Sequence, residues 1–414
     1  MTKMGGFISI FRGNKKGENF FVVPILVIFS ILCFFVPSFS ALPVFNYVTI
    51  ILVAILCIII LVWKMLFHKI LVDYFALLIA VFNIAIFISN IFNKDASHII
   101  TYVTLSGMSF CLYQFFLEKK YRNLIHYIIL FAFAAFAIYF IAYYKSYLFN
   151  FSFQRIGDKF DNLNTVAYYF LYAFVASLSL INIRKVLSFL YILPSILFIF
   201  LLYRTGSRSA LILAIICMLV IPFHLLKGKN RFVPFVIDVC IIVVGIIFVV
   251  IIEKVLNISI FSRLAEFFDA LKGEGVDYSS ANRIELVFQS FQLFLRKPVF
   301  GWGNNVFSIY SSERLFAHNN LTELLCNFGL LGFVPFELIV IISFLKIKKT
   351  KEFSQTTSFA LLLMLCFFGV QFFYVNSQLK FDWIAIAFFV SEATLLSKQE
   401  NQIVKAEQFH ELFI

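Results

Sequence analysis

The sequence predicts an all-α integral membrane protein with about twelve transmembrane helices, on the basis of its composition, its apolar segments and the placement of its basic residues. Of its 414 residues, 62% are hydrophobic and only 14% are charged, whereas soluble domains carry about 25% charged residues. Lipid is therefore the solvent that best explains so much apolar surface. In such a protein a net charge of +12 reflects basic cytoplasmic loops rather than a nucleic-acid partner.

Twelve segments are long and apolar enough to cross a bilayer, which takes about 20 residues of helix. They are roughly 20–37, 43–63, 70–92, 97–116, 124–143, 163–182, 186–203, 208–225, 232–252, 319–345, 357–376 and 380–397. The first is read as a retained span rather than a signal peptide, because a long polar leader precedes it and eleven spans follow. We expect residues 1–414 to form a single polytopic membrane domain.

The distribution of Lys and Arg predicts that both termini are cytoplasmic. The inside connections then contain the basic segments RGNKK, KMLFHK, EKKYR, IRK, KGKNR and KIKKTK, whereas most short outside connections are poor in basic residues. Two longer connections, 144–162 and 253–318, face outward. The second is the long outer loop of the domain.

The segment NRIELVFQSFQLFLRKP in this loop has the pattern of an amphipathic helix. The apolar residues that share one face are Ile284, Val287, Phe288, Phe291 and Leu295. Asn282 and Glu285 have the spacing of a capping box at its start, and Pro298 marks its end. We expect the helix to lie along the outer membrane surface or over a cavity. The G-x-G of the following FGWGNN predicts a tight turn rather than a nucleotide site, because no strand precedes it and the third glycine is missing.

The stretch AHNNLTELL places His318 directly before a span. A capping role at the membrane surface is one interpretation. Asn319 adds hydrogen-bonding capacity and Glu323 lies one turn further on, and polar clusters at the end of a span are often functional. Histidine is also the side chain best suited to proton transfer near neutral pH. His318 is therefore a candidate general base.

Arginines occur where the positive-inside rule disfavours them. YRTGSRSALIL places Arg204 and Arg208 in an outside connection, and Arg283 lies in the first turn of the predicted loop helix. Snorkelling at the interface is the structural alternative. The guanidinium group binds phosphate in a bidentate manner, and a helix N-terminus favours anions, so these arginines are candidate ligands of an anionic group.

A further polar cluster, FDNLNTVAYYF, leads into the sixth span, with Asn164 near the start of the helix. Helix capping alone explains it equally well. On the predicted topology Asn164, Arg208, Arg283 and His318 all face outward and form a basic pocket with one histidine. No H-E-x-x-H, D-x-D or paired His/Asp motif faces outward, so we expect neither a catalytic metal nor another cofactor.

The motifs GDKFDNLN, TGSRSA, RIELVFQSFQLFLRKPVFGWGNN and AHNNLTELLCNFGLLGF, in this order, resemble those of the O-antigen ligase and O-antigen polymerase superfamily. The resemblance covers most of the chain. It implies a GT-C-like membrane fold and an inverting, metal-independent transfer of glycan from undecaprenyl diphosphate to an acceptor hydroxyl, outside the bacterial inner membrane. It further implies that Arg208 and Arg283 bind the diphosphate and that His318 is the base.

Within this superfamily the motifs HNNLTELLCNFGLLGF and FDNLN are more similar to polymerases, and Arg204 offers outward charge for a second diphosphate. The acceptor would then be a lipid-linked repeat, with membrane lipid around it and a chain-length regulator as a further partner. A ligase that transfers the chain to lipid A–core is the alternative within the superfamily. A transporter of anionic solutes is the alternative from another class, but internal repeats and a polar site at mid-membrane are not evident.

Overall fold

The computed structural model describes residues 15–39, 43–93, 99–148, 162–181, 185–225, 239, 278–304, 306–311, 316–349, 354–375, 377 and 379–411. In this part of the chain every regular element is a helix. The helices are α2 Lys15–Phe39, α3 Pro43–Phe67, α4 Tyr74–Phe92, α5 Ile99–Phe116, α6 Lys119–Leu148, α7 Leu163–Ser179, η1 Val186–Tyr191, α8 Ile192–Thr205, α9 Arg208–Leu225, α12 Tyr278–Arg296, α13 Val306–Tyr310, α14 Asn320–Lys349, α15 Gln355–Gln371 and α16 Lys380–Glu411. The predicted all-α class is confirmed.

Among the described residues, seven helices are long and apolar enough to cross a membrane. They are Glu18–Pro37, Tyr47–Phe67, Tyr74–Phe92, Ile99–Phe116, Lys119–Leu148, Val186–Thr205 and Asn320–Lys349. Three shorter apolar helices, Leu163–Ser179, Arg208–Val220 and Gln355–Gln371, coincide with predicted spans. The predicted span 232–252 lies outside the described residues, apart from residue 239. The predicted span 380–397 begins α16 but is not among the seven. The count of twelve therefore stays a prediction.

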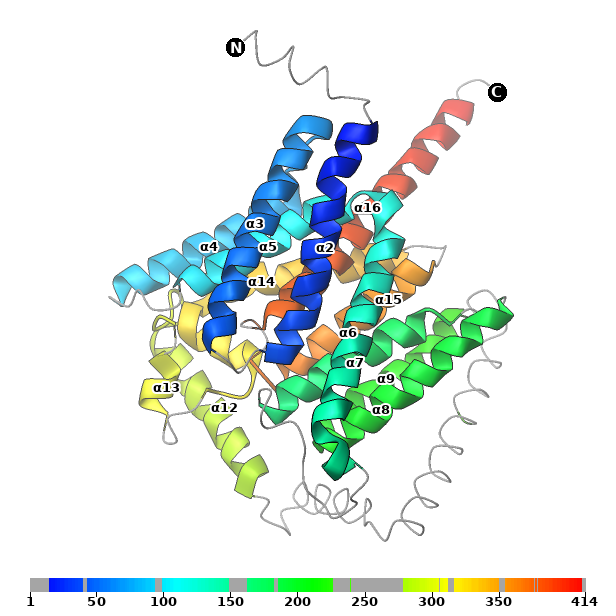
Figure 1. The fold of residues 1–414 in the computed structure, drawn as a ribbon. Helices are drawn as coiled ribbons and strands as arrows, with labels where there is room; N and C mark the ends of the chain where they lie inside the picture. The colour runs from blue at the N-terminus through cyan, green and yellow to red at the C-terminus, as the bar shows by residue number, and fades with distance from the viewer. Residues whose placement is uncertain are drawn as a thin grey trace.

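The helices form one bundle in which distant parts of the sequence are neighbours (Figure 1). α14 packs against α4, α16 and α12, and α7 packs against α8, α15 and α6. The start of α2 and the end of α16 lie toward the same end of the molecule, and α12 lies toward the opposite end (Figure 1). The starts of α7 and α9 also lie toward the α12 end, which we call the outer end.

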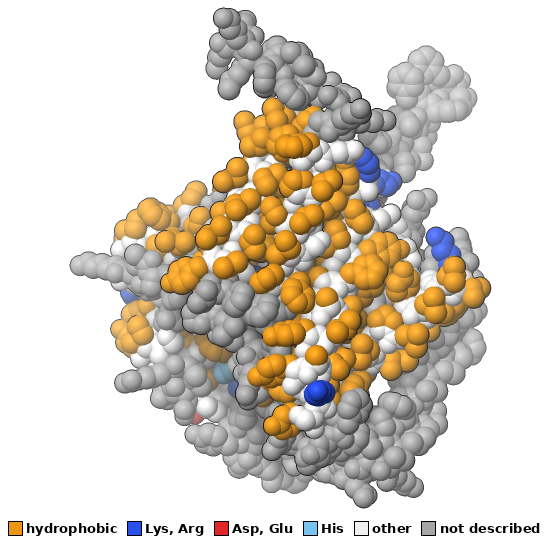
Figure 2. Space-filling model, viewed as in Figure 1, with side chains coloured by type: hydrophobic (Ala, Val, Ile, Leu, Met, Phe, Trp, Pro, Cys, Tyr) orange, Lys and Arg blue, Asp and Glu red, His pale blue; other side chains and the backbone are white. Residues whose placement is uncertain are grey.

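The side chains are arranged as in a membrane protein, with many apolar residues on the exterior. Figure 2 shows hydrophobic side chains covering the visible face over α2, α3 and α6. Large apolar residues such as Phe20, Ile58 and Phe131 are exposed on these helices. The interior contains aromatic residues, including Trp63 and Trp383, together with buried polar groups. Because lipid is as apolar as the interior, exposed apolar residues are expected on a spanning helix.

One helix, α14, is broken at Gly329, whose φ of 60° and ψ of −163° are not helical. The loop after α12 occupies the break. Leu330 N–H donates to the Pro298 carbonyl (2.8 Å) and Leu331 N–H to the Val299 carbonyl (3.2 Å). An unbroken helix would pair these two donors with the carbonyls four residues earlier, on Cys326 and Asn327.

Those two carbonyls are satisfied by the same loop. Trp302 N–H donates to the Cys326 carbonyl and Gly303 N–H to the Asn327 carbonyl, each at 2.9 Å. Four loop–helix bonds thus replace two helical ones, which is how irregular backbone is tolerated within a membrane helix. The predicted G-x-G turn is present, since Gly301 and Gly303 both have positive φ. Counting from Leu330 to Lys349, twenty residues follow the break, or about 30 Å of helix, enough to cross the hydrocarbon core.

The polar end of α4 anchors this loop. Ser89 Oγ donates to the Asn327 carbonyl (2.8 Å), and Asn93 Nδ2 donates to the Gly301 carbonyl (3.3 Å). Asn90 Oδ1 accepts from the backbone N–H of Asn304 (3.1 Å). The position of α14 and the path of the outer loop are therefore fixed together by one end of α4.

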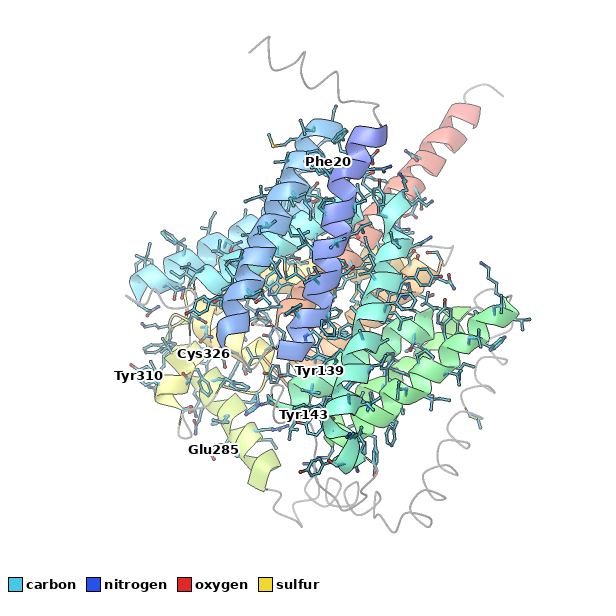
Figure 3. All side chains as sticks on the ribbon, viewed as in Figure 1. Phe20, Tyr139, Tyr143, Glu285, Tyr310 and Cys326 are labelled. Carbon is cyan, nitrogen blue, oxygen red and sulfur yellow. The ribbon has the colours of Figure 1, made fainter. Side chains whose placement is uncertain are left out.

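The helix predicted in the outer loop is α12, but it begins at Tyr278, four residues before Asn282. The predicted capping box is therefore wrong. Asn282 lies inside the helix, and Glu285 Oε1 accepts a hydrogen bond from Gln289 Nε2 (2.9 Å) instead. On its inner side α12 packs through Leu286 in a small cluster with Phe307, Ala317 and Cys326. Figure 3 marks Glu285 and Cys326 at this end of the molecule.

Candidate functional site

The predicted site residues that the structure describes lie toward the same end of the bundle, on five different helices or their ends. Asn164 is in the first turn of α7 and Arg208 is the first residue of α9. Arg283 is on α12 and His318 lies two residues before α14. The starts of α7, α9 and α14 contribute N–H groups with a partial positive charge, which favours an anion at this end.

Asn164 and the start of α9 are joined by a direct hydrogen bond. Asn162 caps α7 by accepting from the backbone N–H of Asn164 (2.9 Å). The side-chain oxygen of Asn164 accepts from Ser207 Oγ (3.0 Å). Gly206, with φ of 70°, ends α8 in the left-handed conformation, so the chain turns directly into α9. These contacts place Arg208 beside the start of α7.

Arg204 has a different environment from Arg208. Its side chain is buried, and Nη2 donates to the backbone carbonyl of Tyr147 near the end of α6 (2.5 Å). This bond ties the end of α8 to the end of α6. Binding of a diphosphate by Arg204 stays a prediction, and it would have to coexist with this contact.

His318 occupies a constrained turn. Its φ is 53°, and it is the one non-glycine residue with positive φ among the residues that the structure describes. The left-handed conformation costs a non-glycine residue about 1–2 kcal/mol, so neighbouring contacts must hold it. The ring of His318 packs on Phe316, with centroids 4.3 Å apart, and Phe316 in turn packs on Tyr374 at 5.7 Å.

Glu323 and Asn319 hold the backbone on either side of His318. Glu323 is buried, and its Oε2 accepts from the N–H of Ala317 (2.8 Å) while Oε1 accepts from Asn327 Nδ2 (3.1 Å). Asn319 Oδ1 accepts from the N–H of Thr322 (3.1 Å) and so caps α14. Asn327 is also the residue whose carbonyl binds the inserted loop. The turn at His318 is thus connected to the break in α14 through the side chains of Glu323 and Asn327.

Arg283 is close enough to affect the protonation of His318. Partial burial lowers the pKa of His318 to about 4, and the positive charge of Arg283 contributes to this effect. The imidazole is therefore neutral at pH 7 and able to accept a proton. No hydrogen-bond partner for its Nδ1 atom occurs in the described part of the chain.

Two tyrosines complete the site and were not predicted from the sequence. Tyr168, on α7, shares a hydrogen bond with Ser209 at the start of α9 (3.0 Å) and is also within reach of the charge of Arg283. Tyr374 accepts a hydrogen bond from Thr165 Oγ1 (3.0 Å). Both lie in aromatic, apolar-looking runs, which are typical of a helix core, so the sequence carried no signal that separates them from packing residues.

The structure therefore brings together His318 and Arg283, connects Asn164 to the start of α9, and places Glu323 and Asn319 directly behind His318. The charge of Arg283 acts on both His318 and Tyr168 of α7, so it influences both halves of the group. Among the described residues, no cluster of His, Cys, Asp or Glu is arranged to hold a metal ion. A neutral imidazole beside a guanidinium group and helix N-termini is suited to proton acceptance next to a bound anion.

The described part of the chain is all-helical, with seven candidate spans and a polar group at one end, which is the architecture of a polytopic membrane protein. Residues 193–336 match the model of a family described as O-antigen ligase. This match supports membership of the chain in the superfamily of O-antigen ligases and O-antigen polymerases, and a role in polysaccharide biosynthesis. No curated protein matches the chain. The apolar helices and the family match together indicate a protein of the bacterial inner membrane.

The matched segment runs from α8 to the middle of α14. It contains Arg204, Arg208, Arg283, His318 and Glu323, and it also contains the inserted loop and the break at Gly329. Asn164 and Tyr168, on α7, lie before the matched segment.

Proposed function

We propose that this protein is a bacterial surface-polysaccharide polymerase, of O-antigen or capsule. It would transfer a glycan from undecaprenyl diphosphate to a sugar hydroxyl of a second, lipid-linked glycan at the outer face of the inner membrane. The observation that carries this proposal is that His318, held in a left-handed turn by Glu323, lies where the charge of Arg283 acts on it, within the segment that matches the O-antigen ligase family.

The reaction needs a base on one side of the sugar and a cation on the other. In the proposed step, the acceptor oxygen forms a bond to the anomeric carbon while the bond from this carbon to the diphosphate oxygen breaks. The hydroxyl proton passes to His318, and the diphosphate leaves with the bonding electrons. Attack opposite the leaving group inverts the anomeric centre, and no metal or other cofactor takes part.

Arg283 and Arg208 are assigned to the diphosphate, whose negative charge increases as the bond breaks. Loss of one such preorganised donor typically lowers the rate by about 10²–10³-fold. Arg283 would also link binding to catalysis. A diphosphate neutralises its charge and so removes one of the two causes that lower the pKa of His318. The histidine would become a stronger base when the donor is bound.

An O-antigen ligase is the second candidate, because the matched family is described by that activity. The same residues would then act on the same donor, with lipid A–core as the acceptor. The two functions differ in the products that accumulate when the protein is absent.

The test is glycan banding on gels from cells that lack the protein and are complemented with wild type, His318→Ala or Arg283→Ala. A polymerase predicts that the deletion leaves lipid A–core with a single repeat, or a single lipid-linked repeat, and that only wild type restores the ladder. A ligase predicts bare lipid A–core and accumulated lipid-linked chains.

Arg296→Ala is the matched control for Arg283→Ala. Arg296 is exposed in the last turn of the same helix, α12, so this variant removes the same charge away from His318. It should restore the ladder. A full ladder with His318→Ala at normal protein level would show that the histidine is not the base and serves only the turn before α14.

A further inference from the structure

The outward face of α12 carries an exposed apolar row. Ile284, Phe288, Phe291 and Leu295 are exposed to 72%, 60%, 41% and 59%. Their spacings of four, three and four residues place them on one side of the helix, over a length of about 16 Å. Leu286, Ser290 and Phe294 are buried on the other side, against the bundle. The row is therefore not needed for packing α12 onto the protein.

At one end, the row continues into the lipid-facing surface of a spanning helix. Beyond Arg296, Lys297 and Pro298, the exposed residues Val299 and Phe300 follow Leu295 along the chain. The ring of Phe300 packs against Phe92 at the end of α4, with centroids 5.1 Å apart. α4 is a candidate span, and its exposed residues Leu77, Ile84, Phe87 and Ile91 share one side at helical spacing, with Phe92 next to Ile91. Exposed apolar residues of α4 thus meet those that follow α12 at the contact between Phe92 and Phe300.

At the other end, the row stops beside a charge. Ile284 is preceded by Arg283, whose charge contributes to the lowered pKa of His318. The surface thus offers a hydrocarbon-binding strip that ends at a guanidinium group. A ligand that matches it has a long apolar chain with an anionic group at one end.

We propose that this row, Ile284 to Leu295, binds the polyprenyl chain of the lipid-linked donor, which enters sideways from the bilayer along α4. The inference rests on the proposed function, because it takes Arg283 to be the ligand of the donor diphosphate. The chain would lie on the row while its diphosphate contacts Arg283. The row then acts as the selector for a long lipid carrier, separate from the residues that carry out the transfer.

The experiment measures binding rather than transfer, with the full-length protein in vesicles of a neutral phospholipid. The two probes are undecaprenyl diphosphate and geranyl diphosphate, which carry the same charged group on a long and a short chain. The variant is Phe288→Ser combined with Phe291→Ser. Ile309→Ser is the control, since Ile309 is also exposed (71%) but lies on α13, off the row.

We expect the double variant to bind undecaprenyl diphosphate about tenfold more weakly, because two rings no longer cover the chain. Binding of geranyl diphosphate should be unchanged, and Ile309→Ser should resemble wild type for both probes. A photo-reactive phenylalanine analogue at position 288 should capture undecaprenyl diphosphate.

Three results would overturn the proposal. The first is unchanged binding of undecaprenyl diphosphate by the double variant. The second is an equal loss for both probes, which would mean that α12 and Arg283 have shifted. The third is capture at position 288 of phospholipid only, or of a second copy of the protein. If wild type binds neither probe, or if Arg283→Ala binds both as wild type does, the proposed function itself fails, which is a different outcome.

Discussion

Gly329→Ala tests whether the break in α14 depends on glycine. At φ 60° and ψ −163° the backbone is in a region essentially restricted to glycine, and another residue there costs about 1–3 kcal/mol. An added Cβ would also lie 2.8 Å from the backbone nitrogen of Gly301 and closer still to the carbonyl oxygen of Val299. These are backbone atoms of the paired loop, so no rotamer change relieves the overlap. Overpacking of this kind costs about 1–3 kcal/mol, which gives about 2–6 kcal/mol in all.

The measurement is the free energy of unfolding in detergent, by chemical denaturation. Gly301→Ala should behave similarly, because its Cβ would lie 2.6 Å from the nitrogen of Gly329. Gly107→Ala in α5 is the matched control, since nothing lies within 4 Å of its Cβ. Alanine in a helix should leave that stability unchanged or raise it by up to about 1 kcal/mol. If Gly329→Ala were as stable as Gly107→Ala, the break in α14 and its pairing with the loop would be wrong.

Three further predictions concern His318 and a buried ion pair. Glu323→Ala should lower kcat by about 10²-fold with little change in the donor KM, because His318 moves while the proposed diphosphate ligands stay in place. In steady-state kinetics of correctly folded protein, Glu323→Gln should recover part of this loss. An effect on KM alone would contradict the positioning role of Glu323. The pKa of His318 is lowered to about 4 by burial and by Arg283, so kcat/KM should fall only as the pH drops through about 4. Arg283→Gln should move this acidic limb of the pH profile to higher pH. An unmoved limb would argue against the proximity of Arg283 and His318. Glu392→Ala leaves buried Arg122 without its partner at 2.6 Å and should lower the free energy of unfolding by about 3–5 kcal/mol in denaturation experiments. Replacement of both residues by apolar side chains should restore stability. If it does not, the pair is needed for more than charge balance.

Much of the fold follows from helical apolar patterns that the sequence displays directly. The long spans and the amphipathic helix α12 were predicted because their signals are local. The candidate residues were predicted for the same reason, as polar groups at the ends of apolar runs. The start of α12 was misplaced, because Asn282 and Glu285 satisfy a capping pattern while the helix extends one turn earlier.

The break in α14 could not be predicted from the sequence. In LLCNFGLLGF a glycine inside an apolar helix is tolerated at a cost of about 1 kcal/mol, so it does not by itself indicate a break. The break exists because residues 298–303, far away in the sequence, supply the missing backbone partners. The role of Glu323 depends on the same non-local contacts. The hydrogen bonds that Glu323 accepts from Ala317 and Asn327 can be recognised only once the loop has been placed in the structure.

The insertion of residues 298–303 into α14 limits how this protein can be recombined with its relatives. The outer loop looks like an appendage that could be exchanged to alter acceptor choice. Its backbone, however, completes a membrane helix, and its amide and lysine contacts reach the end of α4 through Asn93. A chimaera that swaps only the loop would leave four backbone groups without partners in a region of low polarity. The smallest exchangeable unit is therefore discontinuous in the sequence. The end of α4, the loop from α12 onward and the first half of α14 have to be exchanged together.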